Sequence, residues 1–346
     1  MTPPTGDLHL PPLILGIMAR SHDRPEARMA VMDSALTQGV RTFDTAPLYG
    51  FGQADALLGR VLDDRTRREV SILGKVGLRW GDDAVGDVLF ETRDADGERV
   101  VVRRDSRPEA VIDDVMRSLE RLGVERLDLV QIHQPDRRTP IGETMAALED
   151  LQHAGIVGHI GVCNFDARQV EAARAAASGS RLFSLQTEYS LIRRQCETEL
   201  VPACRRQQVA LLAYSPLAGG RLTGAGMPGD PALARAIDGG LRTAADRLGV
   251  APAALALRWV IEQPGVRAAV TGASSPAQLR ALGEALEAPV TPEMLSDLGA
   301  AFARVAAAER RRAEGGPLAS LRKRAGELLR RIGLDPAGPG SRGAAW

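Results

Sequence analysis

Eight short apolar runs alternate with eight amphipathic helical segments along most of the chain, and this rhythm limits its fold more than any other feature. The runs are a few residues long and largely apolar on both faces, which is typical of strands buried in a parallel sheet. We predict strands at residues 13–18, 40–44, 70–75, 127–133, 159–163, 183–188, 209–214 and 267–272. The predicted helices lie near residues 25–37, 53–63, 108–122, 141–154, 166–177, 195–206, 251–262 and 276–286.

Eight successive repeats of strand and helix favour a (β/α)8 TIM barrel of the α/β class, in which the parallel strands close into a ring. A doubly wound open sheet is the alternative, because 346 residues also suffice for two ordinary α/β domains. That fold would normally use fewer strands per domain and a linker between the domains, and the chain shows no convincing linker. We therefore predict one barrel over residues 1–305.

Residues 77–107 interrupt the rhythm after the third predicted strand, and they are too long and too charged for an ordinary loop. On a barrel this insertion would lie at the mouth, where long loops shape a binding site or a lid. A solvated excursion or a small hairpin explains its composition equally well. A second long segment, rich in Gly and Pro, follows the seventh strand at residues 215–250.

The last segment, residues 306–346, differs in character because it is strongly basic. We predict a basic helical tail, an extra amphipathic helix outside the barrel, with a disordered end rich in Gly and Pro. Packing against the barrel or against a partner subunit in a homo-oligomer is the favoured role, since nucleic-acid or membrane binding has little other support. The helical spacing is carried by Leu318, Leu321, Ala325, Leu328, Leu329 and Ile332.

The overall charge gives no reason to expect a nucleic-acid or membrane partner, since Lys plus Arg and Asp plus Glu both number 44. The three cysteines show no metal-binding spacing and the histidines are scattered, so neither a metal site nor a disulfide framework is predicted. The N-terminal residues lack a basic segment and their apolar stretch is broken by prolines, so no signal peptide is expected. We predict a reduced, cytoplasmic protein.

Four polar residues stand where predicted strands end. Asp44, Lys75 and His133 close three consecutive apolar runs, and Tyr49 lies five residues after Asp44 in the sequence DTAPLYG. A parallel α/β barrel gathers the C-terminal ends of its strands at one mouth, so these side chains should converge there. Each residue alone has an ordinary explanation, such as a cap, a surface charge or a packing contact. Their joint occurrence at consecutive strand ends indicates a catalytic site.

An acid, a phenol, an amine and an imidazole together can protonate and polarise a carbonyl group. Tyrosine alone is a poor acid at neutral pH, and we expect the Lys75 ammonium to favour the phenolate of Tyr49. Asp44 can keep Lys75 charged, and His133 can orient the carbonyl by a hydrogen bond. Reduction also needs a hydride, which no side chain provides, so a nicotinamide cofactor is predicted.

Seven motifs follow one another in order within residues 10–305: FDTAPLYGFG (43–52), GKVGLRW (74–80), RSLERLGVERLDLVQIHQPD (117–136), GHIGVCNF (158–165), LQTEYSLI (185–192), YSPLAGGRLTG (214–224) and VTGASSPAQL (270–279). Together they resemble the aldo-keto reductase superfamily. The resemblance implies a (β/α)8 barrel, NADP(H) or NAD(H) bound without a Rossmann domain, and reversible carbonyl reduction by the tetrad Asp44, Tyr49, Lys75 and His133. The branch is similar to bacterial general stress reductases, and potassium-channel β-subunits are more distant relatives.

For the nicotinamide end of the cofactor, the resemblance implies Asn164 and Gln186 as ligands of the carboxamide, with Tyr214 stacked on the ring. Cys163 stands where the family usually has a serine before the asparagine. A thiol forms weaker hydrogen bonds than a hydroxyl, so this departure predicts a lower affinity for the cofactor.

For the rest of the cofactor, the resemblance implies small and polar residues that let the backbone approach phosphate. Basic residues that the family often places near the 2′-phosphate are missing, which leaves Ser274, Ser275 and Arg280 for that contact. NADP(H) is the expected cofactor because it predominates in the superfamily, and NAD(H) is the alternative. The implied residues are Ser215, Leu217 and Gly219 at the pyrophosphate, and Gly272, Ser274 and Gln278 at the adenosine.

Aromatic residues make up only 3% of the chain, so those near the mouth are candidates for substrate contact. Phe51, Trp80 and Tyr189 are such residues, and family position puts Trp80 closest to the substrate; anchoring the 77–107 insertion is its alternative role. The predicted function is reversible NAD(P)(H)-dependent reduction of an aldehyde, ketone or sugar-like carbonyl with Tyr49 as proton donor. A cofactor-sensing regulatory subunit with little turnover is the alternative, motivated by the basic tail and the weakened cofactor motif.

Overall fold

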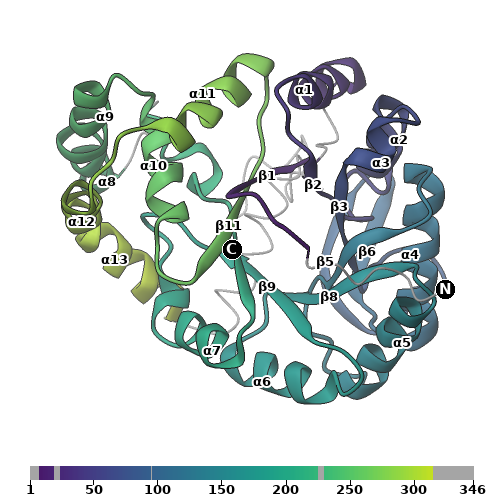
Figure 1. The fold of residues 1–346 in the computed structure, drawn as a ribbon. Helices are drawn as coiled ribbons and strands as arrows, with labels where there is room; N and C mark the ends of the chain where they lie inside the picture. Colours follow the sequence, from purple (N-terminus) through teal and green to yellow (C-terminus); the bar gives the residue numbers. More distant parts are fainter. Residues whose placement is uncertain (1–7, 19–23, 95, 225–229, 315–346) are drawn as a thin grey trace.

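The computed structural model describes residues 8–18, 24–94, 96–224 and 230–314. In these ranges eight parallel strands close into a barrel in the order β1-β11-β10-β9-β8-β7-β3-β2 (Figure 1). The closed ring confirms the predicted (β/α)8 fold and rules out the open doubly wound sheet. The barrel strands are β1 (Leu13–Gly16), β2 (Thr42–Asp44), β3 (Ser71–Val76), β7 (Leu127–Ile132), β8 (Val157–Cys163), β9 (Leu182–Glu188), β10 (Ala210–Tyr214) and β11 (Val266–Thr271).

A helix follows each barrel strand and packs around the outside of the ring (Figure 1). Six of these helices were predicted to within one residue at both ends, in part because proline at the first helical position marks the start of several. The eight outer helices are α1 (Pro25–Thr37), α2 (Gln53–Val61), α4 (Pro108–Leu122), α5 (Ile141–His153), α6 (Ala167–Ala176), α7 (Leu200–Gln207), α10 (Pro252–Ile261) and α11 (Pro276–Glu287).

The helix predicted over residues 195–206 is wrong as a single element. The structure has a 3₁₀ turn, η1 (Gln195–Glu197), followed by α7, which begins only at Leu200. Pro202 lies in the first turn of α7, where a proline is tolerated. Its ring would clash with the carbonyl group four residues earlier if the helix continued back through Thr198.

Further short helices fill the connections of the barrel. The Gly- and Pro-rich segment after β10 contains several of them, and the chain beyond α11 forms two more. These elements are α3 (Thr66–Glu69), η2 (Ala218–Gly220), α8 (Pro231–Ala236), the π-helical η3 (Ile237–Arg242), α9 (Thr243–Leu248), α12 (Pro292–Ala301) and α13 (Ala303–Glu314).

The interior of the barrel changes from apolar to polar toward the C-terminal ends of its strands. Leu73 on β3 and Leu129 on β7 belong to an apolar cluster inside the ring. Lys75 and Gln131 follow two residues later and lie side by side in the sheet register. Because side chains two residues apart point to the same face of a strand, polar groups cap an apolar interior. The mouth therefore carries polar side chains directly above this apolar cluster.

The insertion after β3 forms a three-stranded antiparallel sheet in the order β4-β6-β5. Its strands are β4 (Leu78–Arg79), β5 (Asp87–Arg93) and β6 (Arg99–Arg104). Phe90 and Val102 of this sheet are buried against Leu48, with Phe51 at the edge of the same cluster. Since Leu48 and Phe51 belong to the β2–α2 loop, the hairpin also helps to shape the mouth.

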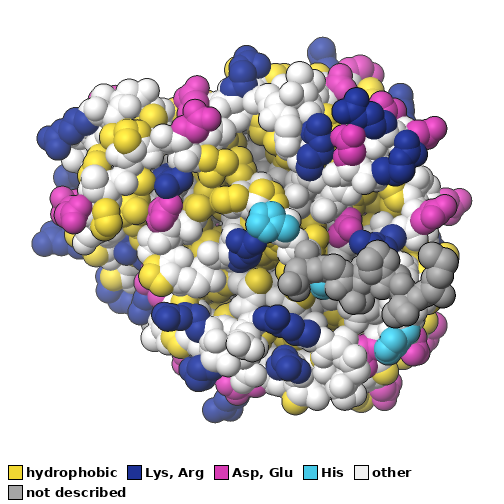
Figure 2. Space-filling view, in the orientation of Figure 1, with side chains coloured by type: hydrophobic (Ala, Val, Ile, Leu, Met, Phe, Trp, Pro, Cys, Tyr) yellow, Lys and Arg dark blue, Asp and Glu magenta, His cyan; other side chains and the backbone are white. Residues whose placement is uncertain are grey.

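The C-terminal segment enters the described structure only in part. Helix α13 runs across residue 305, so the first turns of the predicted tail continue a helix that begins in the barrel segment. The amphipathic helix over 318–332 and the disordered end both lie outside the described residues. Among the residues that the structure describes, no helix is long and apolar enough to cross a membrane. Figure 2 shows basic and acidic side chains interspersed around one face of the molecule.

Candidate active site

The four predicted catalytic residues come together at the mouth. Asp44 is the last residue of β2, Lys75 lies on β3, His133 directly follows β7, and Tyr49 lies in the loop after β2. Lys75 Nζ donates hydrogen bonds to Asp44 Oδ1 at 2.5 Å and to Tyr49 Oη at 3.3 Å. The rings of Tyr49 and His133 meet edge to face with their centroids 6.0 Å apart. The arrangement sets one acid, one amine and one phenol in a row, with the imidazole beside the phenol.

Burial and charge decide the protonation of these groups. Asp44 and Lys75 are each 2% exposed. Burial alone would lower the pKa of Lys75, but the charge of Asp44 and the phenol of Tyr49 reverse this and raise it above its ordinary value. Burial, aided by the Lys75 charge, holds the pKa of His133 well below its usual range. The site at neutral pH therefore holds a lysine ammonium and a neutral imidazole.

The acidity of Tyr49 differs from the sequence expectation. Burial raises the pKa of Tyr49 to about 12, although the nearby Lys75 ammonium lowers it. The lysine thus acts in the predicted direction, and desolvation of the phenolate outweighs it. The phenol stays protonated throughout the neutral range and can serve as a proton donor there.

A buried acid, Asp55, is connected to the tetrad through Thr45, and it was not predicted from the sequence. The Thr45 carbonyl accepts a hydrogen bond from Lys75 Nζ at 3.3 Å. Asp55, fully buried on α2, accepts from Thr45 Oγ1 at 2.5 Å and from Ser118 Oγ on α4 at 3.0 Å. Burial raises the pKa of Asp55. Its signal in the sequence is an acidic residue among the apolar positions of an amphipathic helix.

Backbone strain gathers around this mouth. Five non-glycine residues of the described chain have positive φ, and four of them belong to the candidate site: Phe51 (53°), Asn164 (63°), Ser215 (54°) and Ala218 (50°). The fifth, Gln208, ends α7. Such conformations cost free energy and persist only where the surroundings enforce them, so they mark functional regions.

The predicted nicotinamide ligands are hydrogen-bonded into the tetrad. Gln186 Nε2 donates to Asp44 Oδ2 at 2.7 Å. Asn164 Nδ2 donates to the His133 carbonyl at 3.0 Å, and Tyr214 Oη donates to Asn164 Oδ1 at 2.9 Å. These bonds hold two amides and one partly exposed aromatic ring at the mouth, a donor set that fits a flat carboxamide-bearing ring.

Cys163 contributes a thiol at the end of β8. Its Sγ lies 3.1 Å from Asn164 Nδ2, and burial raises its pKa to about 12. Cys163 therefore stays a neutral thiol at neutral pH, at the position where relatives usually have a serine.

The other implied cofactor residues form two separate groups. Ser215, Leu217 and Gly219 lie in the loop after β10, in or beside η2. Gly272, Ser274 and Gln278 lie at the start of α11, where Gln278 Oε1 accepts from the Ser274 backbone N–H at 2.6 Å and from its hydroxyl at 2.9 Å. Gly219 and Gly272 are exposed, which leaves their backbone open to approach by a ligand.

The candidate substrate residues separate into a pair and an outlier. Phe51 and Trp80 stack edge to face with ring centroids 5.2 Å apart beside the mouth loop. Tyr189, by contrast, is 2% exposed; its hydroxyl donates to Glu197 and its ring packs against Trp259. The prediction that Tyr189 faces the substrate is therefore wrong, because its ring belongs to the core between the barrel and its helices.

A second buried cation lies four residues beyond Lys75 and was not predicted. Arg79 donates to the Ala110 carbonyl at 2.9 Å and to the carboxylates of Asp83, Asp113 and Asp114 at 2.6, 2.8 and 3.2 Å. The bonds to Ala110, Asp113 and Asp114 attach β4, the first strand of the small sheet, to α4. Asp83 is close in sequence, but Ala110, Asp113 and Asp114 are each more than 30 residues away, so no local pattern predicted this set of partners.

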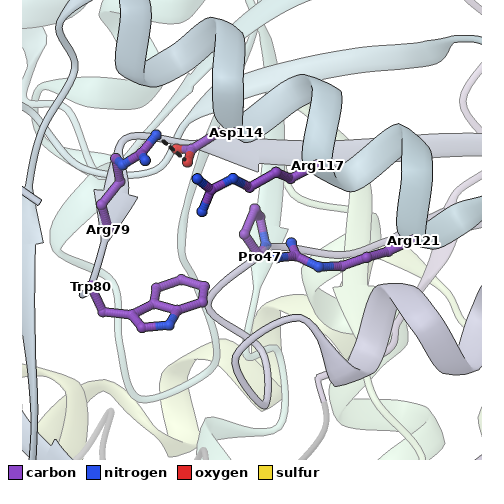
Figure 3. Close-up of a pocket in the computed structure, with 6 residues that line it drawn as sticks. All are labelled: Pro47, Arg79, Trp80, Asp114, Arg117 and Arg121. Atoms are coloured by element: carbon purple, nitrogen blue, oxygen red, sulfur yellow. Dashed lines mark hydrogen bonds and ion pairs between the residues drawn. The ribbon is translucent and has the colours of Figure 1, made fainter. Parts of the chain in front are cut away.

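Arg79 also borders a small recess between the mouth loop, β4 and α4 (Figure 3). Arg121 lies there against Gly52, where an added Cβ would approach its Nε to 2.7 Å. Gly52 has φ of 94°, a conformation that favours glycine, and an added Cβ would also displace the Arg121 side chain. The recess is lined by Pro47, Arg79, Trp80, Asp114, Arg117 and Arg121.

No group of three or more His, Cys, Asp or Glu side chains in the described ranges could hold a metal ion. The chemistry of the mouth is that of proton donors and amides.

Comparison with known proteins gives a consistent result. The model of the Aldo/keto reductase family matches residues 12–302. The chain is 33% identical over 271 residues to the aldo-keto reductase YhdN of Bacillus subtilis, covering 72% of this chain and 76% of that protein. It is 30% identical over 261 residues to an NADH-specific methylglyoxal reductase of Escherichia coli, covering 70% and 77%.

The expected likeness to potassium-channel subunits is also found. A probable voltage-gated potassium channel subunit beta of Oryza sativa subsp. japonica is 27% identical over 305 residues, covering 80% of this chain and 88% of that protein. Among solved structures, a glycerol dehydrogenase of Gluconobacter oxydans superposes with a TM-score of 0.75 at 30% identity, covering 87% and 94% of the two chains.

Proposed function

The chain belongs to the aldo/keto reductase family and is an oxidoreductase of carbonyl compounds, and on this premise we propose its mechanism, coenzyme and substrate class. The proposed reaction is the reversible reduction of an aldehyde or ketone to an alcohol, with Tyr49 as proton donor. The observation that carries the proposal is the chain of contacts from Asp44 through Lys75 to Tyr49, with His133 beside the phenol.

In the proposed mechanism the substrate carbonyl oxygen lies between the Tyr49 hydroxyl and the His133 imidazole. A bound nicotinamide supplies the hydride that adds to the carbonyl carbon. Tyr49 transfers its proton to the oxygen as negative charge develops there, because an alkoxide is a far stronger base than a phenolate. The Lys75 ammonium then stabilises the phenolate, and Asp44 keeps that ammonium charged and in place.

The neutral state of His133 suits an orienting role. With its pKa held well below the usual range, the imidazole does not compete with Tyr49 for the proton transfer at neutral pH. One ring nitrogen can still donate a hydrogen bond to the carbonyl oxygen. His133 thus selects the orientation of the substrate, while Tyr49 provides the acid.

For the coenzyme we propose NADP(H), with NAD(H) as the alternative. The amides of Asn164 and Gln186, the ring of Tyr214 and the small residues after β10 support a nicotinamide dinucleotide. The exposed residues Ser274 and Arg280 at the start of α11 are the groups offered to a 2′-phosphate. The NADH-specific relative supports the alternative.

For the substrate we propose a small polar carbonyl compound, with sugar-like molecules included. The named activities of two relatives, on methylglyoxal and on glycerol, support this class. The pair Phe51 and Trp80 gives the mouth one apolar wall for the carbon chain. The proposed place of action is the cytoplasm, which suits three free and buried thiols.

The second candidate function is a cofactor-sensing subunit with little turnover. The likeness to a plant channel subunit favours it, together with the thiol of Cys163 beside the proposed carboxamide ligand. It differs from the first proposal in one measurable respect, since a sensor binds the dinucleotide without consuming it.

The deciding experiment titrates the purified protein with NADPH and with NADH, following nicotinamide fluorescence, and then adds a panel of aldehydes, ketones and sugars. Binding followed by oxidation of the reduced dinucleotide supports the reductase and identifies the coenzyme. Tight binding without turnover on any carbonyl supports the sensor. Absence of binding to both dinucleotides would refute both candidates.

A further inference from the structure

Helix α13 is tied to the mouth by one buried acid. Glu309 is 3% exposed and accepts from Arg221 at 3.3 and 3.4 Å and from Arg312 at 2.9 Å. Its other oxygen lies 3.1 Å from the guanidinium of Arg193. A carboxylate taken out of water needs such partners, because an unpaired buried charge is costly. The ion pairs of Glu309 therefore attach α13 to the segments that carry Arg193 and Arg221.

Two of these arginines come from the loops that follow neighbouring barrel strands. Arg193 lies in the turn after β9, the strand that carries Gln186. Arg221 directly follows η2, in the loop after β10 that contains the proposed pyrophosphate residues. Asp230 at the start of α8 adds a second acid 3.7 Å from Arg221. Glu309 thus joins a helix from the end of the barrel segment to both loops beside the proposed cofactor site.

The loop after β10 is held in a strained form. Ser215 and Ala218 both have positive φ, and Leu222 at the end of the loop is fully buried. Strain of this kind persists only where surrounding contacts enforce it. Arg221 is the ionic anchor next to Leu222, so losing its bond to Glu309 would leave the loop with fewer constraints.

We propose that Glu309 and Arg221 are positioning residues for the nicotinamide dinucleotide: their ion pair holds the 215–222 loop over the bound dinucleotide and sets the rate of its release. The proposal rests on the proposed function, because it requires that the loop covers a dinucleotide. It assigns to α13 a part in ligand release, although α13 lies outside the eight strand–helix repeats.

The test compares Arg221→Gln, Glu309→Gln and the double variant with the matched control Arg312→Gln. Glutamine keeps most of the shape and removes the charge. Arg312 also bonds to Glu309 but sits on α13 itself and is half exposed, so its loss leaves the bridge to the loop intact. The measurement is the dissociation rate of NADPH or NADH, followed by stopped-flow nicotinamide fluorescence in the full-length protein.

We expect the dissociation rate to rise about ten-fold in both single variants, since a loop that has lost its ionic anchor opens more often and lets the ligand leave sooner. The double variant should rise by clearly less than the product of the two single effects, because the pair between Arg221 and Glu309 is already lost in each single variant. Arg312→Gln should match the wild type. The rate of hydride transfer with the dinucleotide saturating, and its pH profile, should stay unchanged, whereas general loosening of the fold would lower that rate.

Three results would overturn the proposal: wild-type release rates in both single variants, additive effects in the double variant, or an equal rise in Arg312→Gln. If Glu309→Gln does not fold, Arg221→Gln and its control carry the test. A wild-type protein that binds neither dinucleotide would refute the proposed function itself. Normal binding and turnover with unchanged release in the variants would refute the clamp alone.

Discussion

Two buried cations lie four residues apart on one stretch of chain, and they are used in opposite ways. Lys75 on β3 is 2% exposed and Arg79 on β4 is 5% exposed. Lys75 faces one carboxylate, and it also donates to a carbonyl and to the phenol of Tyr49. Arg79 faces three carboxylates and a carbonyl.

The comparison shows that the partners of a buried cation decide whether it can take part in a reaction or only stabilise the fold. The charge of Arg79 is neutralised more than once, so it fastens the small sheet to α4 and has nothing left for a reacting group. The charge of Lys75 is balanced once, and its third contact is a phenol that can become an anion. A cation with one donor directed at an ionisable neutral group can stabilise charge that appears during a reaction.

The largest effect is expected at the phenol that Lys75 serves. Tyr49→Phe should lower kcat by about a thousand-fold, because the proton donor is lost while the ring remains. Dinucleotide binding should stay near the wild-type value in a fluorescence titration. Tyr189→Phe is the matched control, since its hydroxyl meets Glu197 away from the mouth. Full turnover in Tyr49→Phe would end the assignment of this residue as the acid.

The second effect concerns the structural cation. Arg79→Met should lower the free energy of unfolding by about 3 kcal/mol, because it leaves the buried carboxyl group of Asp114 and a buried carbonyl without their partner. Turnover of the folded fraction should change little. Arg99→Met removes an exposed pair with Glu91 and should cost less than about 1 kcal/mol. Urea unfolding of both variants is the measurement. A collapse of turnover in folded Arg79→Met would contradict the division of roles.

The third change removes Lys75, the cation proposed to act in catalysis. Lys75→Met should lower kcat about a hundred-fold, since the phenolate loses its stabilising charge. Lys75 lowers the pKa of Tyr49, so the alkaline limb of the pH–rate profile should move to higher pH in this variant. Lys75→Arg keeps the charge and should recover part of the rate. An unmoved alkaline limb would show that Lys75 does not act through Tyr49.

The smallest effect is a pH dependence beside Arg79. Burial raises the pKa of folded Asp114 to about 7, so between the ordinary carboxyl pKa and that value the folded state keeps a proton that the unfolded chain has released. Its contribution to stability is therefore present at acidic pH and is lost as the pH rises toward 7.

Asp114→Asn removes this dependence, since the amide does not titrate. The stability of the wild type relative to Asp114→Asn should fall by about 1.4 kcal/mol from about pH 5 to about pH 6. Unfolding midpoints at several pH values measure the difference. Parallel curves for the two proteins would place the pKa of Asp114 in its usual range.

The sequence predicted the barrel and the tetrad because both depend on local patterns. Apolar runs predicted the strands, and polar residues at their ends had to meet once the ring closed. Arg79 and Glu309 gave no such signal, since the partners that join them to other elements, Asp114 for Arg79 and Arg221 for Glu309, lie far away in the chain. Glu309 stands among Ala and Arg residues, which is typical of an exposed helix face.

The sequence also could not predict how burial weighs against charge. It predicted the effect of Lys75 on Tyr49 but not the larger effect of desolvation, because the depth of the phenol is a property of the packed mouth. The prediction that Tyr189 contacts the substrate was wrong for the same reason, since its ring packs against Trp259. Residue type and strand position were enough to predict which residues lie near one another at the mouth. The orientation and burial of each side chain depend on tertiary packing, which the sequence pattern does not show.

The apolar layer inside the barrel has a consequence for the order of events in a catalytic cycle. Leu73 and Leu129 lie one side-chain layer below Lys75, and such a lining excludes water from that end of the ring. In the proposed mechanism Tyr49 would have to recover a proton after each reduction, and the apolar layer leaves the solvent side of the mouth as its source. The alcohol would occupy that same opening. Reprotonation of the tyrosine would then follow product departure, and the site would be ready for chemistry only when it is also empty.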